Sequence, residues 1–287
     1  MNDNRIRFTR TNGSPREPEA APDDGLHLWW LGQAGFLIRC GGISLVIDPY
    51  LSDALAEKYA GTTYPHRRMM PPPMAPEELT GLDLYLSSHA HSDHMDPGLL
   101  PVAAAANPRC RFLVPEAVRS VAENRGAPAD RIIGLDAGDL LEPFPGLTVR
   151  AVPAAHERVD TDAAGRHRYL GYVVRWQGLG VYHPGDCLPY PGLEDHLDGN
   201  DIHLALMPVN GRSETLAAAG IAGNFDITQA LDLTRRLEIP YMIPHHFGMF
   251  AFNTVDPVAL ERAIRSENME RRVFPAQVGV RYGLEER

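Results

Sequence analysis

The residues with the clearest chemical potential are three histidines and one aspartate packed close together. His89, His91, Asp93 and His94 occupy six consecutive positions in the order H-x-H-x-D-H. Crowding removes water from these imidazoles and this carboxylate, which costs free energy unless a bound cation offsets it. The run therefore predicts a metal site. In an extended segment, side chains two residues apart point the same way, and His89 and His91 can therefore reach one ion. Four ligands this close favour two metal ions over one.

The flanking sequence predicts that this run lies on a loop between a strand and a helix. Residues 82–88 alternate in apolar character like a buried strand, and Asp96-Pro97 is typical of a helix start. A structural zinc site is not expected, because the three cysteines of the chain lie far apart. Histidine and aspartate sites that keep a position for water are typical of catalysis.

Three further positions could complete the site, each directly after an apolar segment expected to form a strand. They are His156, Asp186 in a Pro-Gly-Asp turn, and the pair His245-His246. Taken singly, each has another interpretation: a surface histidine, a turn former, an exposed strand end. Their repeated placement at strand ends favours ligands, since loop-borne sites are positioned by a rigid scaffold. Asp186 is the best bridging ligand, because one carboxylate can bind two metals at once.

Length and composition define the broad class of protein. The 287 residues allow a substantial core, and 44% hydrophobic with 22% charged residues is an ordinary globular composition. The 37 acidic and 27 basic residues give a net charge of −10, which argues against a nucleic-acid partner. No apolar run approaches the ~20 residues of a membrane span, and the polar start is not a signal peptide. We therefore expect a cytoplasmic protein with a small-molecule substrate and no membrane partner. A homo-oligomer is possible, because the sequence does not determine the oligomeric state.

We expect a flexible arm over residues 1–25, which are polar and rich in Pro, Gly and acidic residues, and one folded domain over residues 26–287. Residues 52–81 interrupt the strand pattern and predict a long ordered loop. Strands are expected at residues 26–31, 36–40, 43–47, 111–114, 147–152, 170–176, 179–183, 202–207 and 240–243, and helices from Asp96, over 115–125 and over 226–237. This order predicts mixed sheets covered by helices in one domain.

The order H-x-H-x-D-H, then His156, Asp186 and a late histidine, resembles the metallo-β-lactamase superfamily. More narrowly, the chain is similar to the L-ascorbate-6-phosphate lactonase-like group. The matching segments are residues 30–36, 47–52, 68–73, 76–79, 183–186, 208–212, 223–226 and 243–249. The resemblance implies an α/β fold, a four-layer αβ/βα sandwich of two mixed β-sheets flanked by helices, with a dinuclear site at its open edge.

The resemblance also implies how the ligands divide between two divalent ions, Mn or Zn. It places one metal on His89, His91 and His156, the other on Asp93, His94 and His246, and Asp186 between them. His246 is preferred to His245 because the family ligand precedes an aromatic residue, here Phe247. Ligands without thiolate suit both metals, and the resemblance favours manganese.

The expected activity is hydrolysis of an ester-like bond, a lactone of a small anionic molecule resembling a sugar phosphate. Two metals lower the pKa of a bridging water, so that hydroxide attacks the carbonyl while Asp93 relays a proton. Arg212 is expected to bind the substrate anion, with Arg68 as a second candidate and a surface salt bridge as the other interpretation of Arg212. His183 or Glu157 could orient ligands through hydrogen bonds.

Two other activities fit the same ligand set. The first is hydrolysis of a phosphodiester, as in phospholipase D-like or nuclease-like relatives, although the acidic balance counts against large polymers and bilayers. The second is a di-iron redox protein, which would need an electron-transfer module that the sequence does not show. A binding module without catalysis is the weakest alternative, since no expected ligand is missing.

Overall fold

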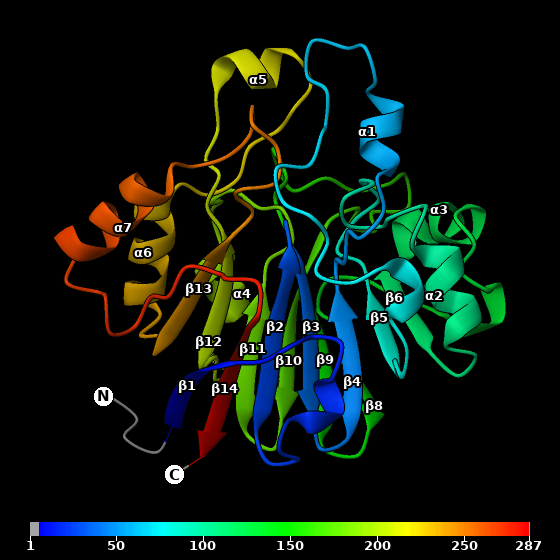
Figure 1. Cartoon of the computed structure of the whole chain (residues 1–287), viewed down its shortest axis with the longest axis horizontal. Helices are drawn as coiled ribbons and strands as arrows, with labels where there is room; N and C mark the ends of the chain where they lie inside the picture. Colours follow the sequence, from blue (N-terminus) through cyan, green and yellow to red (C-terminus); the bar gives the residue numbers. More distant parts are fainter. Residues whose placement is uncertain (1–5, 287) are drawn as a thin grey trace.

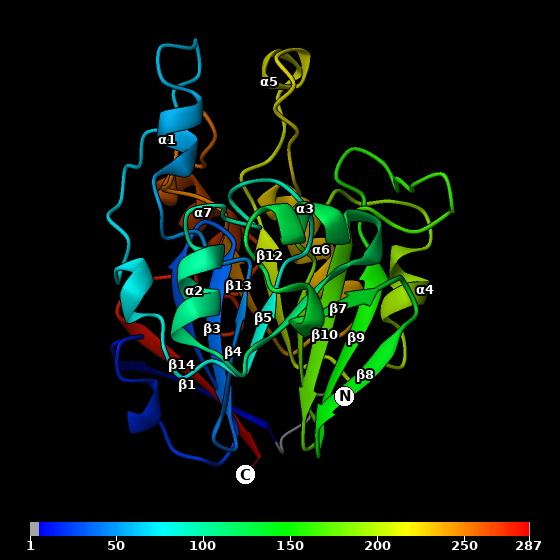
Figure 2. The same ribbon diagram turned by 90° about the vertical axis from the view of Figure 1, so that its right-hand side faces the viewer.

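The computed structural model describes residues 6–286, which form two β-sheets packed face to face (Figures 1 and 2). In this part of the chain, the strand order of the first sheet is β1-β14-β2-β3-β4-β5-β6-β7, and that of the second is β13-β12-β11-β10-β9-β8. The first sheet contains β1 (Ile6–Asn12), β14 (Val280–Glu286), β2 (Leu26–Gly32), β3 (Gly35–Cys40), β4 (Ile43–Ile47), β5 (Leu84–Leu86), β6 (Arg111–Pro115) and β7 (Ile132–Leu135). The second contains β13 (Tyr241–His245), β12 (Leu204–Pro208), β11 (Leu179–His183), β10 (Leu170–Trp176), β9 (Leu147–Pro153) and β8 (Leu140–Phe144).

Helices lie outside the two sheets and in the loops above them (Figure 1). They are α1 (Ala54–Lys58), α2 (Leu100–Ala106), α3 (Arg119–Asn124), α4 (Leu193–Leu197), α5 (Glu214–Ala218), α6 (Ile227–Arg236) and α7 (Pro257–Ser266). Short 3-10 turns occur at Pro18–Ala20, Pro76–Glu78, Glu116–Val118 and Ala129–Arg131. None of the helices within residues 6–286 is long and apolar enough to cross a membrane.

Alternation along β2 shows how the layers are built. Leu28 and Trp30 point into the core between the two sheets, whereas Trp29 and Leu31 belong to a second core against α2 and α3. Successive side chains of a strand face opposite sides, so one apolar run supplies both cores. On the far side, α6 packs on β12 and β13. Both sheets are mixed, with parallel and antiparallel pairs. The expected four-layer sandwich is confirmed.

All the expected strands and the clearest helix are present. The antiparallel pair β3 and β4 turns at Gly41-Gly42, where both glycines have positive φ. Helix α6 begins after Asp226, whose side chain accepts from the backbone N–H of Gln229 in a capping box. The helix expected from Asp96 begins instead at Leu100. Over 115–125 a 3-10 turn precedes α3.

Strand β1 corrects the expectation that residues 1–25 form a flexible arm. It pairs antiparallel with β14 from Ile6 opposite Glu286 to Asn12 opposite Val280. The ring of Phe8 stacks on Tyr241 and Phe274, with centroids 4.9 and 5.0 Å apart. The sequence does not show this strand because it lies at the sheet edge with most of its side chains partly or fully exposed. Residues 1–5 lie outside the described residues.

Candidate metal centre

Loops at one end of the sandwich bring all seven expected ligands together. His89 follows β5, His156 follows β9, Asp186 follows β11, and His246 follows β13 directly. Three groups of side chains have potential ligand atoms within 4.8 Å of one another: His89, His91 and His156; His89, His94 and Asp186; Asp93, His94 and His246. The first and third groups are the two ligand sets that the resemblance implied, and Asp186 belongs to the group that links them.

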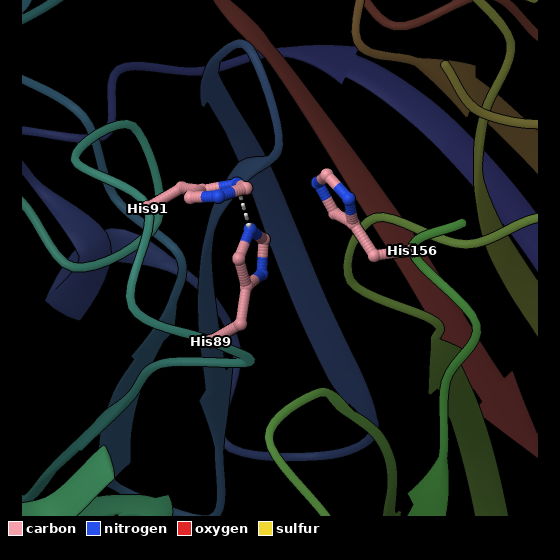
Figure 3. Close-up of side chains that lie close together, drawn as sticks. All are labelled: His89, His91 and His156. Carbon is pink, nitrogen blue, oxygen red and sulfur yellow. Dashed lines mark hydrogen bonds between the residues drawn. The ribbon is translucent and has the colours of Figure 1, made fainter. Parts of the chain in front are cut away.

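In the first group, three imidazoles converge from two loops (Figure 3). His89 Nε2 lies 3.0 Å from His91 Nδ1, near the ~3.3 Å edge of a tetrahedron with metal–nitrogen bonds of about 2.0–2.1 Å. Burial, followed by the charges of His94 and His91, holds the pKa of His89 well below its usual range. Burial lowers the pKa of His91 to about 4. Neutral imidazole, the form favoured here, is the form that binds metals.

The two oxygens of Asp186 face different histidine groups. Oδ1 lies 3.2 Å from Nε2 of His94 and 3.0 Å from Nε2 of His246. Oδ2 lies 3.6 Å from Nε2 of His156. Although Nε2 of His94 is buried beside this carboxylate, it is not aligned for a hydrogen bond. A cation between the two side chains would satisfy both, and the donor set therefore fits a metal.

Charge around His94 supports the same conclusion. Burial disfavours its protonated form, but the carboxylates of Asp186, Asp48 and Asp93 outweigh burial and hold the pKa of His94 well above its usual range. Burial likewise opposes ionisation of Asp186, yet the charges of His246 and His94 keep the pKa of this carboxyl well below its usual range. Three carboxylates around one imidazole form a cluster in which divalent cations would supply the balancing charge.

Asp48 and Ser88 orient two of the histidines, although neither was expected from the sequence to be a site residue. Asp48 is fully buried and accepts hydrogen bonds from Nδ1 of His94, the backbone N–H of Ser88 and the Ser88 hydroxyl. The same hydroxyl lies 2.9 Å from Nδ1 of His89. Both histidines thereby direct Nε2 toward the centre. An acidic residue directly after the apolar segment 43–47 is the signal that could have identified Asp48.

Two amide side chains hold the carboxylates, and they too were missed. Gln33 Nε2 donates to Asp93 Oδ2 at 2.9 Å and lies 3.2 Å from His246 Nε2. Asn224 Nδ2 donates to Asp186 Oδ1 at 3.1 Å. Gln33 and Asn224 are uncharged and lie far in the chain from the carboxylates that they contact. No short sequence motif links such pairs, so the contacts are visible only in the folded structure.

Backbone strain also concentrates at the centre. Gln33, Asp48 and His246 have φ of 49°, 48° and 64°, the left-handed region that side chains other than glycine rarely adopt. Strained residues of this kind persist where the surrounding structure holds them, and they cluster at functional sites. At His246, the turn directs the imidazole into the centre as β13 ends.

The neighbouring His245 points the other way. Its ring stacks on His183 at 5.2 Å and meets Phe36 edge-on at 5.3 Å, fully buried between the sheets. His183 lies 2.8 Å from the carbonyl oxygen of Ala34 through Nε2, and its Nδ1 accepts from the Gly185 N–H. It therefore fixes the turn that carries Asp186. Glu157 is exposed.

Cys187, next to Asp186, is a packed thiol. It is fully buried, its sulfur accepts from the Ala155 N–H at 3.4 Å, and it lies 3.3 Å from the carbonyl oxygen of Leu188. Burial raises the pKa of this thiol to about 12. A protonated, hydrogen-bonded sulfur is a core side chain in this setting.

The two expected substrate contacts are placed differently. A cavity of about 280 Å³ lies over the histidines, and Arg68 does not line it. The Arg68 guanidinium donates to the carbonyl oxygens of Tyr50 and Ser52 and pairs with Asp53 at 3.0 Å, so it holds the loop after β4. Arg212 is exposed and lines a second hollow. The two hollows adjoin, because Ile221, Ala222 and Asn253 line both.

Comparison with known proteins agrees with this geometry. Residues 44–247 match the Beta-lactamase superfamily domain. The UPF0173 metal-dependent hydrolase of Aeropyrum pernix is 28% identical over 268 residues, which cover 88% of this chain and 93% of that protein. The solved structure of Igni18, a metallo hydrolase from Ignicoccus hospitalis, covers 91% of this chain with a TM-score of 0.64 and 21% identity, and 99% of its own length is matched. This chain belongs to the metallo-β-lactamase superfamily, among its metal-dependent hydrolases.

A second relative is similar over a shorter stretch. The N-acyl-phosphatidylethanolamine-hydrolyzing phospholipase D 1 of Caenorhabditis elegans is 31% identical over 172 residues. That alignment covers 57% of this chain and 47% of the relative, so this chain matches about half the length of that protein.

Proposed function

We propose that this chain uses two divalent ions, Mn or Zn, to hydrolyse a lactone or a similar ester of a small anionic molecule. The observation that carries the proposal is Asp186, whose two oxygens face two separate groups of histidines. When bound, such ions lower the pKa of water so that hydroxide is available at neutral pH. His89, His91 and His156 would hold one ion, and Asp93, His94 and His246 the other, with Asp186 between them.

The residues around the centre have defined tasks in this proposal. Gln33 holds Asp93 through its amide, and Asp93 lines the cavity, where it can take up and pass on a proton. Asp48 and Ser88 keep the Nε2 atoms of His94 and His89 directed at the centre, where they would hold the ions. Asn224 keeps Asp186 oriented between the two histidine groups.

Arg212 is proposed to bind the anionic group of the substrate. Its hollow adjoins the cavity over the centre, and a guanidinium matches phosphate or carboxylate geometry. Arg212→Ala should raise KM for an anionic lactone about tenfold with little change in kcat, and should leave a neutral lactone unaffected. Arg262→Ala, an exposed arginine on α7, is the matched control. Equal losses for charged and neutral lactones would reject this role.

A phosphodiester is the second candidate substrate, favoured by the partial similarity to the phospholipase D. Steady-state assays of the metal-loaded protein with lactones and with bis-p-nitrophenyl phosphate separate the two. We expect the greater kcat/KM with a lactone. A greater value for the phosphodiester, lost in Asp186→Ala, would replace the lactone proposal.

A further inference from the structure

Two arms rise above the end of the sandwich that carries the metal centre. The α1 arm, residues 53–69, and the α5 arm, residues 211–223, each carry a short helix beyond the strand ends (Figures 1 and 2). Both line the cavity over the centre. The floor of this cavity is made of candidate ligands, among them His91, Asp93 and His246. The two arms therefore flank a substrate whose reacting bond lies on the floor.

The side of the cavity formed by the α1 arm carries packed rings beside one cation. Leu55, Tyr59 and His66 line it together with Phe250 from the loop after β13, and Lys58 of α1 lines it as well. The rings of Tyr59 and His66 stack at 4.2 Å, and His66 meets Phe250 edge-on at 5.0 Å. Nδ1 of His66 is 2.8 Å from the carbonyl oxygen of Tyr64, which fixes the ring. These contacts make a preformed surface of packed rings.

The opposite side carries apolar groups. Ile221 and Ala222 of the α5 arm line the cavity across from the rings, next to Gly220. Both are partly exposed, so burying them against a ligand would remove apolar surface from water. Apolar groups on two sides above a polar floor are typical of a site that takes a ligand with an apolar body and one polar reacting group.

We infer that the cavity binds an apolar group of the substrate between the α1 and α5 arms, next to the bond that is hydrolysed. The inference rests on the proposed function for the position of that bond. It adds a substrate class: an amphipathic ester, with its apolar portion on Tyr59, Phe250 and Ile221 and its anionic end toward Arg212. A fully polar sugar derivative would leave the apolar groups of both walls exposed to water.

Binding of alkyl phosphonates to the full-length, manganese-loaded protein tests this inference without turnover. Isothermal titration with methylphosphonate and hexylphosphonate compares one polar head with and without an apolar chain. We expect hexylphosphonate to bind at least about tenfold more tightly, because the added methylenes are buried between the arms. Ile221→Ser and Tyr59→Ser should each reduce this preference to about threefold or less. Leu140→Ser, at an exposed leucine on β8, is the control that should keep it.

Three results would overturn the inference: equal affinity for the two phosphonates, no binding of hexylphosphonate, or a preference that survives both cavity variants. Circular dichroism of each variant checks that it is folded.

The same experiments distinguish failure of the proposed function from failure of this inference. If no ester is hydrolysed while the chain-length preference is present and is lost in Ile221→Ser, the apolar site stands and the hydrolysis proposal does not.

Discussion

Asp48 controls two candidate ligands without being one. It is fully buried, it accepts from Nδ1 of His94, and it reaches His89 through the Ser88 hydroxyl. Carboxylates in this position fix the tautomer and the orientation of metal-binding imidazoles. Asp48 therefore affects metal affinity although it supplies no ligand atom.

Asp48→Asn should weaken metal binding by about 10- to 100-fold, because an amide can donate as well as accept and no longer fixes the proton on Nδ1 of His94. Competition with a chromogenic chelator measures the affinity. Asp195→Asn, at an exposed aspartate of α4, is the matched control and should bind metal like the wild type. Wild-type affinity in Asp48→Asn would show that the histidines are oriented by other contacts.

The adjacent histidines 245 and 246 offer a sharper comparison. His246→Ala should lose about one metal per chain and nearly all activity, since its Nε2 lies among the candidate ligand atoms. His245→Ala should keep its metal, since that ring is stacked on His183 in the core. Truncating this buried ring should instead lower the free energy of unfolding by about 2–4 kcal/mol. Metal loss in the His245 variant alone would contradict the orientation of this strand end.

At the residue scale, site residues that belong to local motifs were predictable, whereas those that act through long-range contacts were not. The H-x-H-x-D-H run and the strand-end positions of His156 and Asp186 are readable because alternation and turn signals are local. Gln33 reaches Asp93 across 60 positions and Asn224 reaches Asp186 across 38, and no local pattern predicts such pairs. Arg68 was predicted to be a second candidate for binding the substrate; in the fold its guanidinium donates to backbone carbonyls and does not line the cavity.

At the scale of elements, strands that form continuous apolar runs were predictable, whereas three of the edge strands were not. β3 and β4 are buried and apolar along most of their length and were expected within a residue of their bounds. β1, β7, β8 and β14 were missed. Three of them, β1, β7 and β8, lie at sheet edges, and most side chains of β1 and β8 are partly or fully exposed. An edge strand needs only one partner and one apolar face, which leaves a weaker pattern in the sequence.

Strand β1 should contribute to stability through Phe8. Its ring stacks on Tyr241 and Phe274 and joins the first sheet to the end of the second. Phe8→Ala should lower the free energy of unfolding by about 2 kcal/mol, combining lost apolar burial with two lost ring contacts. Guanidinium denaturation of the full chain measures this change. Thr11→Ala, at an exposed position of the same strand, should change it by less than about 0.5 kcal/mol, and an equal effect of the two variants would contradict a docked β1.

At the scale of the whole molecule, the metal centre joins the two sheets. Gln33, Asp48 and His89 follow strands of the first sheet, whereas Asp186 and His246 follow strands of the second. Metal binding should therefore stabilise the complete fold, since the ligand set exists only when both sheets are packed together.

The central claim is that Asp186 joins two metal sites in one chain. Elemental analysis of the protein saturated with manganese or zinc, with protein concentration determined on the same sample, measures it most directly. We predict two ions per wild-type chain and fewer than one in Asp186→Ala, because a single carboxylate serves both positions. One ion per fully saturated wild-type chain, or an unchanged content of two in Asp186→Ala, would contradict the account.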